Sequence, residues 1–231
     1  MDEAIQVIKR HFEKEAEYLT LQLSCVRDWA NADSLFKKIA GASDKAVVLD
    51  YLAELQYGLI FSSLGGTVAF EPFDGIGPDL RVSRQENEFF VEVSRFRCRN
   101  SGLSNSNLTI VPAILPEYGN TERDTNKAYG KILEKLEKQC RYGPTVLSLW
   151  NDDDELEEEI LDACHDIGAD SKYPPEVLYV VCKNKWFKPD ESQFFLYRAS
   201  SNPPPFVDAM MANLYKFSVS DAIARMTGVL T

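Results

Sequence analysis

Apolar residues recur at steps of three and four over the first 30 residues, which is typical of one face of an amphipathic helix. The stripe consists of Ile5, Ile8, Phe12, Ala16, Leu19, Leu23 and Val26. This pattern predicts one long helix, or two with a break, from Asp2 to about Ala30. The stripe must cover either the core of its own subunit, as most such helices do, or the matching helix of a second copy in a homodimer.

Further along, a short helix is predicted between Asn31 and Ser43, and a longer one from Asp44, a suitable N-cap, to Leu64. The longer helix has Val48, Leu52, Leu55 and Leu59 on one face. Glu54 lies within these apolar surroundings. Its position alone favours an exposed helix residue, and the alternative is a partly buried carboxylate that points towards the strands that follow.

A strand is predicted from Gly66 to Phe73, and a β-hairpin follows it. In the hairpin, apolar and polar residues alternate around Leu80 and Val82 and again around Phe89, Val91 and Val93, which is the period of two of half-buried strands. Neighbouring strands lie about 5 Å apart, so Asp79 and Glu92 can meet at one edge of the sheet. Such a carboxylate pair suits Mg²⁺. The alternative is that Asp79 is a turn residue and Glu92 faces solvent.

The second half predicts a basic helix at residues 126–142, with Tyr129, Ile132, Leu133, Leu136 and Cys140 buried. Lys135 and Gln139 lie at one margin of this stripe, with Lys131 slightly further out, where long side chains can reach a cleft. The alternative is a solvated face with pairs such as Lys131 with Glu134. Strands are predicted at 145–150, 177–183 and 193–198, with helices at 151–168 and 206–217. The polar stretch 97–125 is either a functional cover or a loop without function.

Composition narrows the function. A net charge of −11 excludes a protein whose whole surface attracts nucleic acid, although a local basic face is compatible with it. Five cysteines without CxxC spacing argue against a disulfide framework or a zinc site, and they predict a cytoplasmic protein. Two histidines argue against a Ser-His-Asp arrangement. No apolar segment has the length needed to span a bilayer, so no membrane association is expected.

The order helix, three-strand meander, helix and buried strand, over about Asp44 to Trp150, resembles the PD-(D/E)XK nuclease superfamily, which has the restriction-endonuclease-like fold. Pro78-Asp79 and, after twelve residues, Glu92-Val93-Ser94 resemble its signature. The resemblance implies an α/β fold with a central mixed sheet flanked by helices, at residues 44–231, behind an N-terminal helical extension at residues 1–43.

The resemblance also implies a site. Mg²⁺ or Mn²⁺ would be held by Asp79, Glu92, the backbone carbonyl of Val93 and, as in many members, a helix glutamate that corresponds to Glu54. Lys135 and Gln139 match a Lys and a Gln found on the following helix of the family.

Position 94 departs from the family pattern, because Ser94 stands where the family carries a lysine. Either that lysine has migrated, with Lys135 the first choice and Lys131 the second, or hydrolysis is lost. The implied activity is metal-dependent hydrolysis of DNA, bound on a restricted face by Lys131, Lys135, Lys138 and Arg141 or by the loop after Phe96. The alternative is an inactive nuclease-fold subunit for binding or assembly, held to a partner by the N-terminal helix.

Overall fold

The computed structural model describes residues 1–73, 76–96, 121–152, 157–184, 194–214 and 223. Within them, a six-stranded sheet has its strands in chain order from one edge to the other. The strands are β1 (Thr67–Phe70), β2 (Leu80–Arg84), β3 (Asn87–Phe96), β4 (Thr145–Asn151), β5 (Val177–Asn184) and β6 (Phe194–Arg198). The pairs β3–β4 and β4–β5 are parallel, and the other pairs are antiparallel. The predicted α/β class with a mixed sheet is therefore confirmed.

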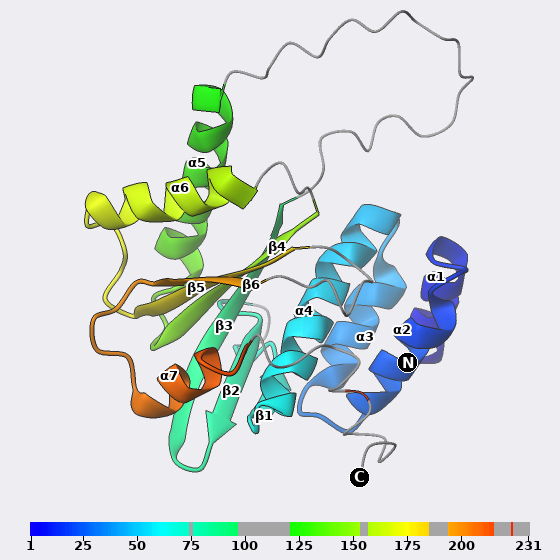
Figure 1. Cartoon of the computed structure of the whole chain (residues 1–231). Helices are drawn as coiled ribbons and strands as arrows, with labels where there is room; N and C mark the ends of the chain where they lie inside the picture. Colours follow the sequence, from blue (N-terminus) through cyan, green and yellow to red (C-terminus); the bar gives the residue numbers. More distant parts are fainter. Residues whose placement is uncertain (74–75, 97–120, 153–156, 185–193, 215–222, 224–231) are drawn as a thin grey trace, which may run out of the picture.

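Helices cover both faces of the sheet (Figure 1). One face packs against α5 (Thr121–Gln139) and α6 (Glu157–Ala169). The other face packs against α4 (Lys45–Ser63) and α7 (Pro205–Met211). The parallel strands β4 and β5 are buried almost throughout, as expected of strands covered on both sides. None of the helices in the described part is long and apolar enough to cross a bilayer.

The N-terminal stripe is covered by its own subunit. It forms two helices, α1 (Asp2–His11) and α2 (Ala16–Cys25), followed by α3 (Ala32–Gly41). Ile8, Phe12, Leu19 and Leu23 are buried in the same cluster as residues of α4 and the sheet. The interpretation as core of the same subunit is thus confirmed, whereas the division of the chain after residue 43 stays a prediction.

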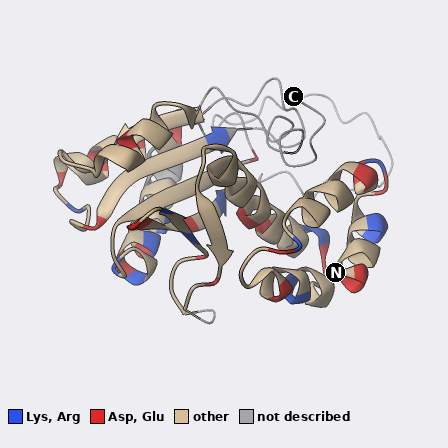
Figure 2. Cartoon of the chain, turned by 90° about the horizontal axis from the view of Figure 1, so that it is seen from below, with Lys and Arg blue, Asp and Glu red and all other residues tan. Residues whose placement is uncertain are grey.

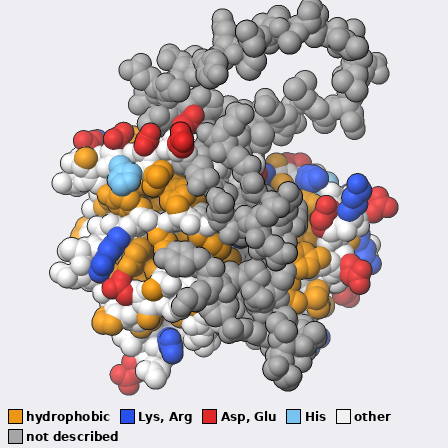
Figure 3. All heavy atoms as spheres, in the orientation of Figure 1, with side chains coloured by type: hydrophobic (Ala, Val, Ile, Leu, Met, Phe, Trp, Pro, Cys, Tyr) orange, Lys and Arg blue, Asp and Glu red, His pale blue; other side chains and the backbone are white. Residues whose placement is uncertain are grey.

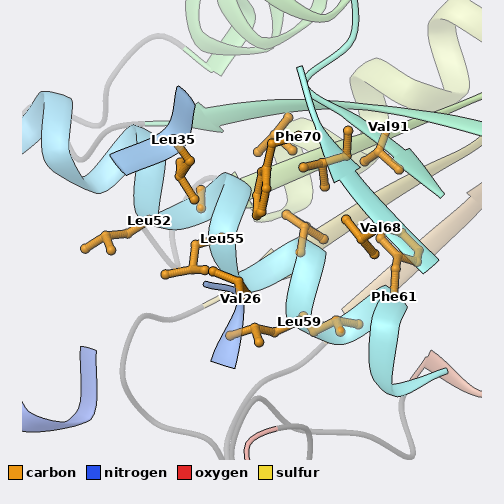
Figure 4. Close-up of a cluster of buried hydrophobic side chains, with 14 of the residues drawn as sticks. Val26, Leu35, Leu52, Leu55, Leu59, Phe61, Val68, Phe70 and Val91 are labelled. Carbon is orange, nitrogen blue, oxygen red and sulfur yellow. The ribbon is translucent and has the colours of Figure 1, made fainter. Parts of the chain in front are cut away.

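The cluster between α4 and the sheet fixes α4 against the hairpin (Figure 4). Leu55, Leu59 and Phe61 from α4 meet Val68 and Phe70 of β1 there. The helix begins where predicted, because the Asp44 carboxylate accepts a hydrogen bond of 2.9 Å from the N–H of Val47. Because α4 is packed on nearly every side, the positions of its buried polar residues are fixed by the surrounding side chains. Glu54 is one of these buried polar residues.

Element boundaries differ from the predictions in a few places. Helix α5 starts at Thr121 and ends at Gln139, earlier at both ends than expected. On α5, Tyr129 and Leu133 are only half-buried, although both were predicted to be buried. Ala128 on the same helix is buried. Residues 97–120, the main part of the stretch considered as a functional cover, lie outside the described residues, as does the end of the predicted closing helix.

Candidate active site

Asp79 lies where strands β2 and β3 separate. The last pair of their ladder is Leu80 with Val91, so Asp79 and Glu92 are the next residues on their strands. The Asp79 carboxylate accepts a hydrogen bond of 2.8 Å from the N–H of Val93. The side chain thus replaces the strand partner that β3 loses at this point. Asp79 therefore lies next to Glu92, as predicted from the hairpin. One of its functions in the structure is to accept the hydrogen bond of a backbone N–H that would otherwise have no partner on β2.

Glu92 projects from β3 towards α5. Its side chain is almost completely buried, and the Lys135 ammonium lies 2.6 Å from its Oε1 atom. Among the described residues, its Oε2 atom is buried with no hydrogen-bond partner. A buried carboxylate oxygen without a donor costs free energy, and such positions call for an explanation such as a ligand or ion. The expectation that Lys135 reaches the carboxylates is therefore met in the structure, and the solvent-facing alternative for Glu92 is wrong.

Glu54 approaches Asp79 from the opposite face of the sheet, on α4. It is only 7% exposed, so the interpretation as an exposed helix residue is wrong. The helix is buried nearly all round, which no single apolar stripe reveals. The Lys38 ammonium lies 3.2 Å from Glu54 Oε2 and 2.6 Å from Glu71 Oε1. The Ser34 hydroxyl donates to the other oxygen of Glu71.

The result is a cluster of the carboxylates Glu54, Glu71, Asp79 and Glu92 with the ammonium groups of Lys38 and Lys135, which we call the carboxylate cluster. Burial, together with the charge of Asp79, raises the pKa of Glu92 to about 8 and raises that of Glu54. Burial also raises the pKa of Asp79, against the hydrogen bond from Val93. These carboxyl groups therefore retain their protons at a higher pH than free carboxyl groups do.

The pKa values of the two lysines are also raised, which for an ammonium group favours the charged form. Burial alone would lower the pKa of Lys38, but Glu54 and Glu71 outweigh it and the pKa rises. The pKa of Lys135 is likewise raised by Glu92 in spite of burial. Both lysines are therefore charged at neutral pH, and they supply the positive charge that lies between these carboxylates.

The remaining residues predicted near the site are placed differently from one another. Ser94 is buried on β3 and brings no cation. Arg95 faces the α4 side, where it contacts Asp50 at 2.9 Å and Asp152 at 2.6 Å. Lys131, the second choice for a migrated lysine, donates to the carbonyl of Arg95 and covers the ring of Phe96, away from Glu92. Gln139 lies one turn beyond Lys135, half-buried, and makes no hydrogen bond to the carboxylates among the described residues.

The donor chemistry fits a hard divalent cation. Carboxylate oxygens from Asp79, Glu92 and Glu54, with the Val93 carbonyl nearby in sequence, are the ligand types that Mg²⁺ and Mn²⁺ take. The unpartnered Oε2 atom of Glu92 is the observation that supports this fit. In the described part of the chain, however, no three or more His, Cys, Asp or Glu side chains are arranged as a ready metal cage. Instead, Lys38 forms an ion pair with Glu54 and Lys135 forms one with Glu92.

The predicted basic face on α5 is weak. Lys131 and Lys135 turn towards the protein, and the exposed Lys138 is paired with Glu134 at 2.7 Å. Glu–Lys pairing on this helix was considered, although with Lys131 as the partner. In Figure 2 the positions of basic residues alternate with those of acidic residues along the N-terminal helices. On the face seen in Figure 3, the basic side chains of the described residues form no continuous area.

Lys38 and Glu71 are the members of the carboxylate cluster that sequence reasoning missed. Lys38 lies at the border of the buried face of α3, next to Ile39, so the argument used for Lys135 also applies to it. Glu71 follows β1 with a φ of +42°, a strained value for a residue other than glycine, and its N–H donates to the Asp79 carbonyl at 2.7 Å. No local pattern in the sequence indicates that conformation.

No protein-family model, curated protein or solved structure matches this chain. The geometry of the carboxylate cluster and the order of the elements are thus the features of this chain that bear on its function.

Proposed function

We propose that this chain hydrolyses phosphodiester bonds of DNA with a divalent metal ion, on a restriction-endonuclease-like core formed by α4, β1–β3, α5 and β4. The observation that carries the proposal is the buried, unpartnered oxygen of Glu92 beside Asp79, at the point where β2 leaves β3. The order of helix, antiparallel meander, helix and parallel strand supports it.

Asp79, Glu92 and Glu54 would hold Mg²⁺ or Mn²⁺, with the Val93 carbonyl as a further ligand. The metal would lower the pKa of a water molecule and neutralise charge on the scissile phosphate. Lys135 replaces the missing lysine at position 94: its ammonium lies at Glu92 and can donate to the attacking water or to a phosphate oxygen. Gln139, one turn further along α5, would contact the substrate.

The experiment is cleavage of supercoiled DNA with Mg²⁺ or Mn²⁺ by the wild type and by Glu92→Ala. Glu88→Ala, exposed on the same strand, is the matched control. We expect wild type and Glu88→Ala to cleave and Glu92→Ala to be inactive. Equal cleavage by Glu92→Ala would identify a contaminating nuclease and refute the assigned site.

Lys135→Met tests the migrated lysine against Lys138→Met, three residues away on the outer side of α5. Loss of a donor to the developing charge costs about 10²–10³-fold in rate. We expect that loss for Lys135→Met and unchanged cleavage for Lys138→Met. Equal rates for the two variants would remove Lys135 from the mechanism.

A second function has its own support, namely an inactive nuclease-fold subunit that binds or assembles with a partner. It is favoured by Ser94 and by the lysines that already neutralise Glu54 and Glu92. Calorimetric titration with Mn²⁺ separates the two: heat that Asp79→Ala abolishes supports the enzyme. A folded protein that binds no Mn²⁺ and forms a dimer dependent on residues 2–30 supports the subunit.

A further inference from the structure

Two hollows flank Trp29, in the link between α2 and α3. The first has a volume of about 480 Å³ and is lined by Arg27, Trp29, Asn31, Asp33, Lys37 and Glu71, among others. The second has a volume of about 320 Å³ and is lined on its other side by Thr67, Arg81 and Ser83. Both volumes are in the range of small-ligand sites. Trp29 is the residue that lines both hollows.

The first hollow leads to the carboxylate cluster. Glu71 lines it and also contacts Lys38, whose ammonium reaches Glu54. Ser34, another lining residue, donates its hydroxyl to Glu71. A chain of direct contacts therefore connects the wall of the hollow with the proposed metal ligands.

Trp29 is held in a fixed orientation. Its ring stacks on Phe70, with centroids 5.9 Å apart and an interplanar angle of 21°, and Gly58 lies under it closely enough that an added Cβ would be 3.3 Å from the indole. Yet the residue is not fully buried, and it borders both hollows. A fixed, partly open indole is the kind of surface on which an unstacked base can lie.

The charged side chains fit a single strand better than a duplex. With Glu71 paired to Lys38, the first hollow has Lys37 against Asp33, and the second has Arg81. Arg27 of the first hollow lies 3.4 Å from Asp28 of the second, and this pair is exposed to solvent. A few cations beside an aromatic ring can follow one phosphate backbone. A duplex needs a broader basic face, and the described residues form none on the face seen in Figure 3.

We propose that the hollows on both sides of Trp29 bind an unpaired segment of nucleic acid, with a base against Trp29 and phosphates at Arg27 and Lys37. As a statement about cleavage, the inference rests on the proposed function. The substrate would then be DNA with a single-stranded segment next to the scissile bond. As a statement about binding, it does not depend on hydrolysis.

Binding is measured in EDTA by fluorescence anisotropy, with labelled oligo(dT) of about twelve nucleotides and a duplex of the same length. The main variant is Arg27→Ala/Lys37→Ala, since both residues are exposed and the change should not affect folding. Lys9→Ala/Arg10→Ala, exposed on α1 outside both hollows, is the charge-matched control. Trp29→Leu is tested after urea unfolding shows that it is folded.

We expect oligo(dT) to bind more tightly than the duplex. Arg27→Ala/Lys37→Ala should bind it roughly tenfold more weakly, with a salt slope about 1.4 smaller. Trp29→Leu should lose roughly tenfold. Preference for the duplex, or an equal loss in the α1 control, overturns the inference.

A cleavage assay on the same preparations separates the two proposals. Cleavage that requires Glu92, together with preferred binding of the duplex, retains the proposed function and overturns this inference. Binding of oligo(dT) that depends on Arg27 and Lys37, without cleavage of single-stranded or duplex DNA, retains the inference and overturns the proposed function.

Discussion

Replacement of Glu92 by glutamine should change the pH dependence of stability. In the folded protein, burial and the charge of Asp79 raise the pKa of Glu92 to about 8, from 4.5 for a free glutamate. Between these two values the folded state binds more protons than the unfolded state, so the free energy of unfolding falls as the pH rises. Glutamine has no proton to lose, and Glu92→Gln should lack this contribution to the pH dependence.

The magnitude follows from the shift. Each pH unit between the two pKa values is worth at most 1.36 kcal/mol, so the full contribution between 4.5 and about 8 is about 5 kcal/mol. Because Glu92 is 2% exposed, solvent screening reduces this value little. The ion pair with Lys135 opposes the shift and is already contained in it. From pH 5 to 8, the free energy of unfolding of Glu92→Gln should therefore rise relative to that of the wild type by about 1 kcal/mol per pH unit.

The assay is urea unfolding of both proteins in EDTA at pH 5, 6, 7 and 8. Glu88→Gln serves as the control for the loss of one charge from the same strand. A difference between wild type and Glu92→Gln that stays constant over this range would show that Lys135 keeps Glu92 ionised, and it would refute the electrostatic argument. With Mn²⁺ added, the wild type should be stabilised and Glu92→Gln should respond less.

Two further substitutions test the ion pair of Glu54 and the packing between the end of α4 and β2. Lys38→Gln leaves Glu54 buried without its counterion and should lower the free energy of unfolding by about 2 kcal/mol at pH 7. Lys37→Gln, at the exposed neighbouring position, is the control and should leave the free energy of unfolding nearly unchanged. Equal urea midpoints for the two variants would contradict this. Gly66→Ala would put a methyl group 2.6 Å from the Val82 side chain and should lower the free energy of unfolding by about 2 kcal/mol. Gly130→Ala, in open space on α5, is the control and should be neutral or stabilising. Thermal unfolding measures both variants.

The hairpin could be predicted from the sequence because its information is local. Alternation fixed which residues face the core, and the turn fixed the register that puts Asp79 next to Glu92. Lys135 followed from its place at the border of a helical stripe. In contrast, Lys38 reaches Glu71 from a helix that precedes it by 33 positions, and such contacts depend on how α3 packs on α4. Glu54 was misplaced because charged residues in helices are usually exposed, and only tertiary packing overrides that rule.

The position of Asp79 at the opening between β2 and β3 has a consequence for the sheet as a whole. Glu54 arrives from the α4 side and Glu92 from the α5 side, and the charge of Asp79 raises the pKa of both. Burial is the larger cause of both shifts, and Asp79 adds to it for a carboxyl group from each layer. Neutralisation of Glu54 on the α4 side should therefore change the protonation of Glu92 on the α5 side.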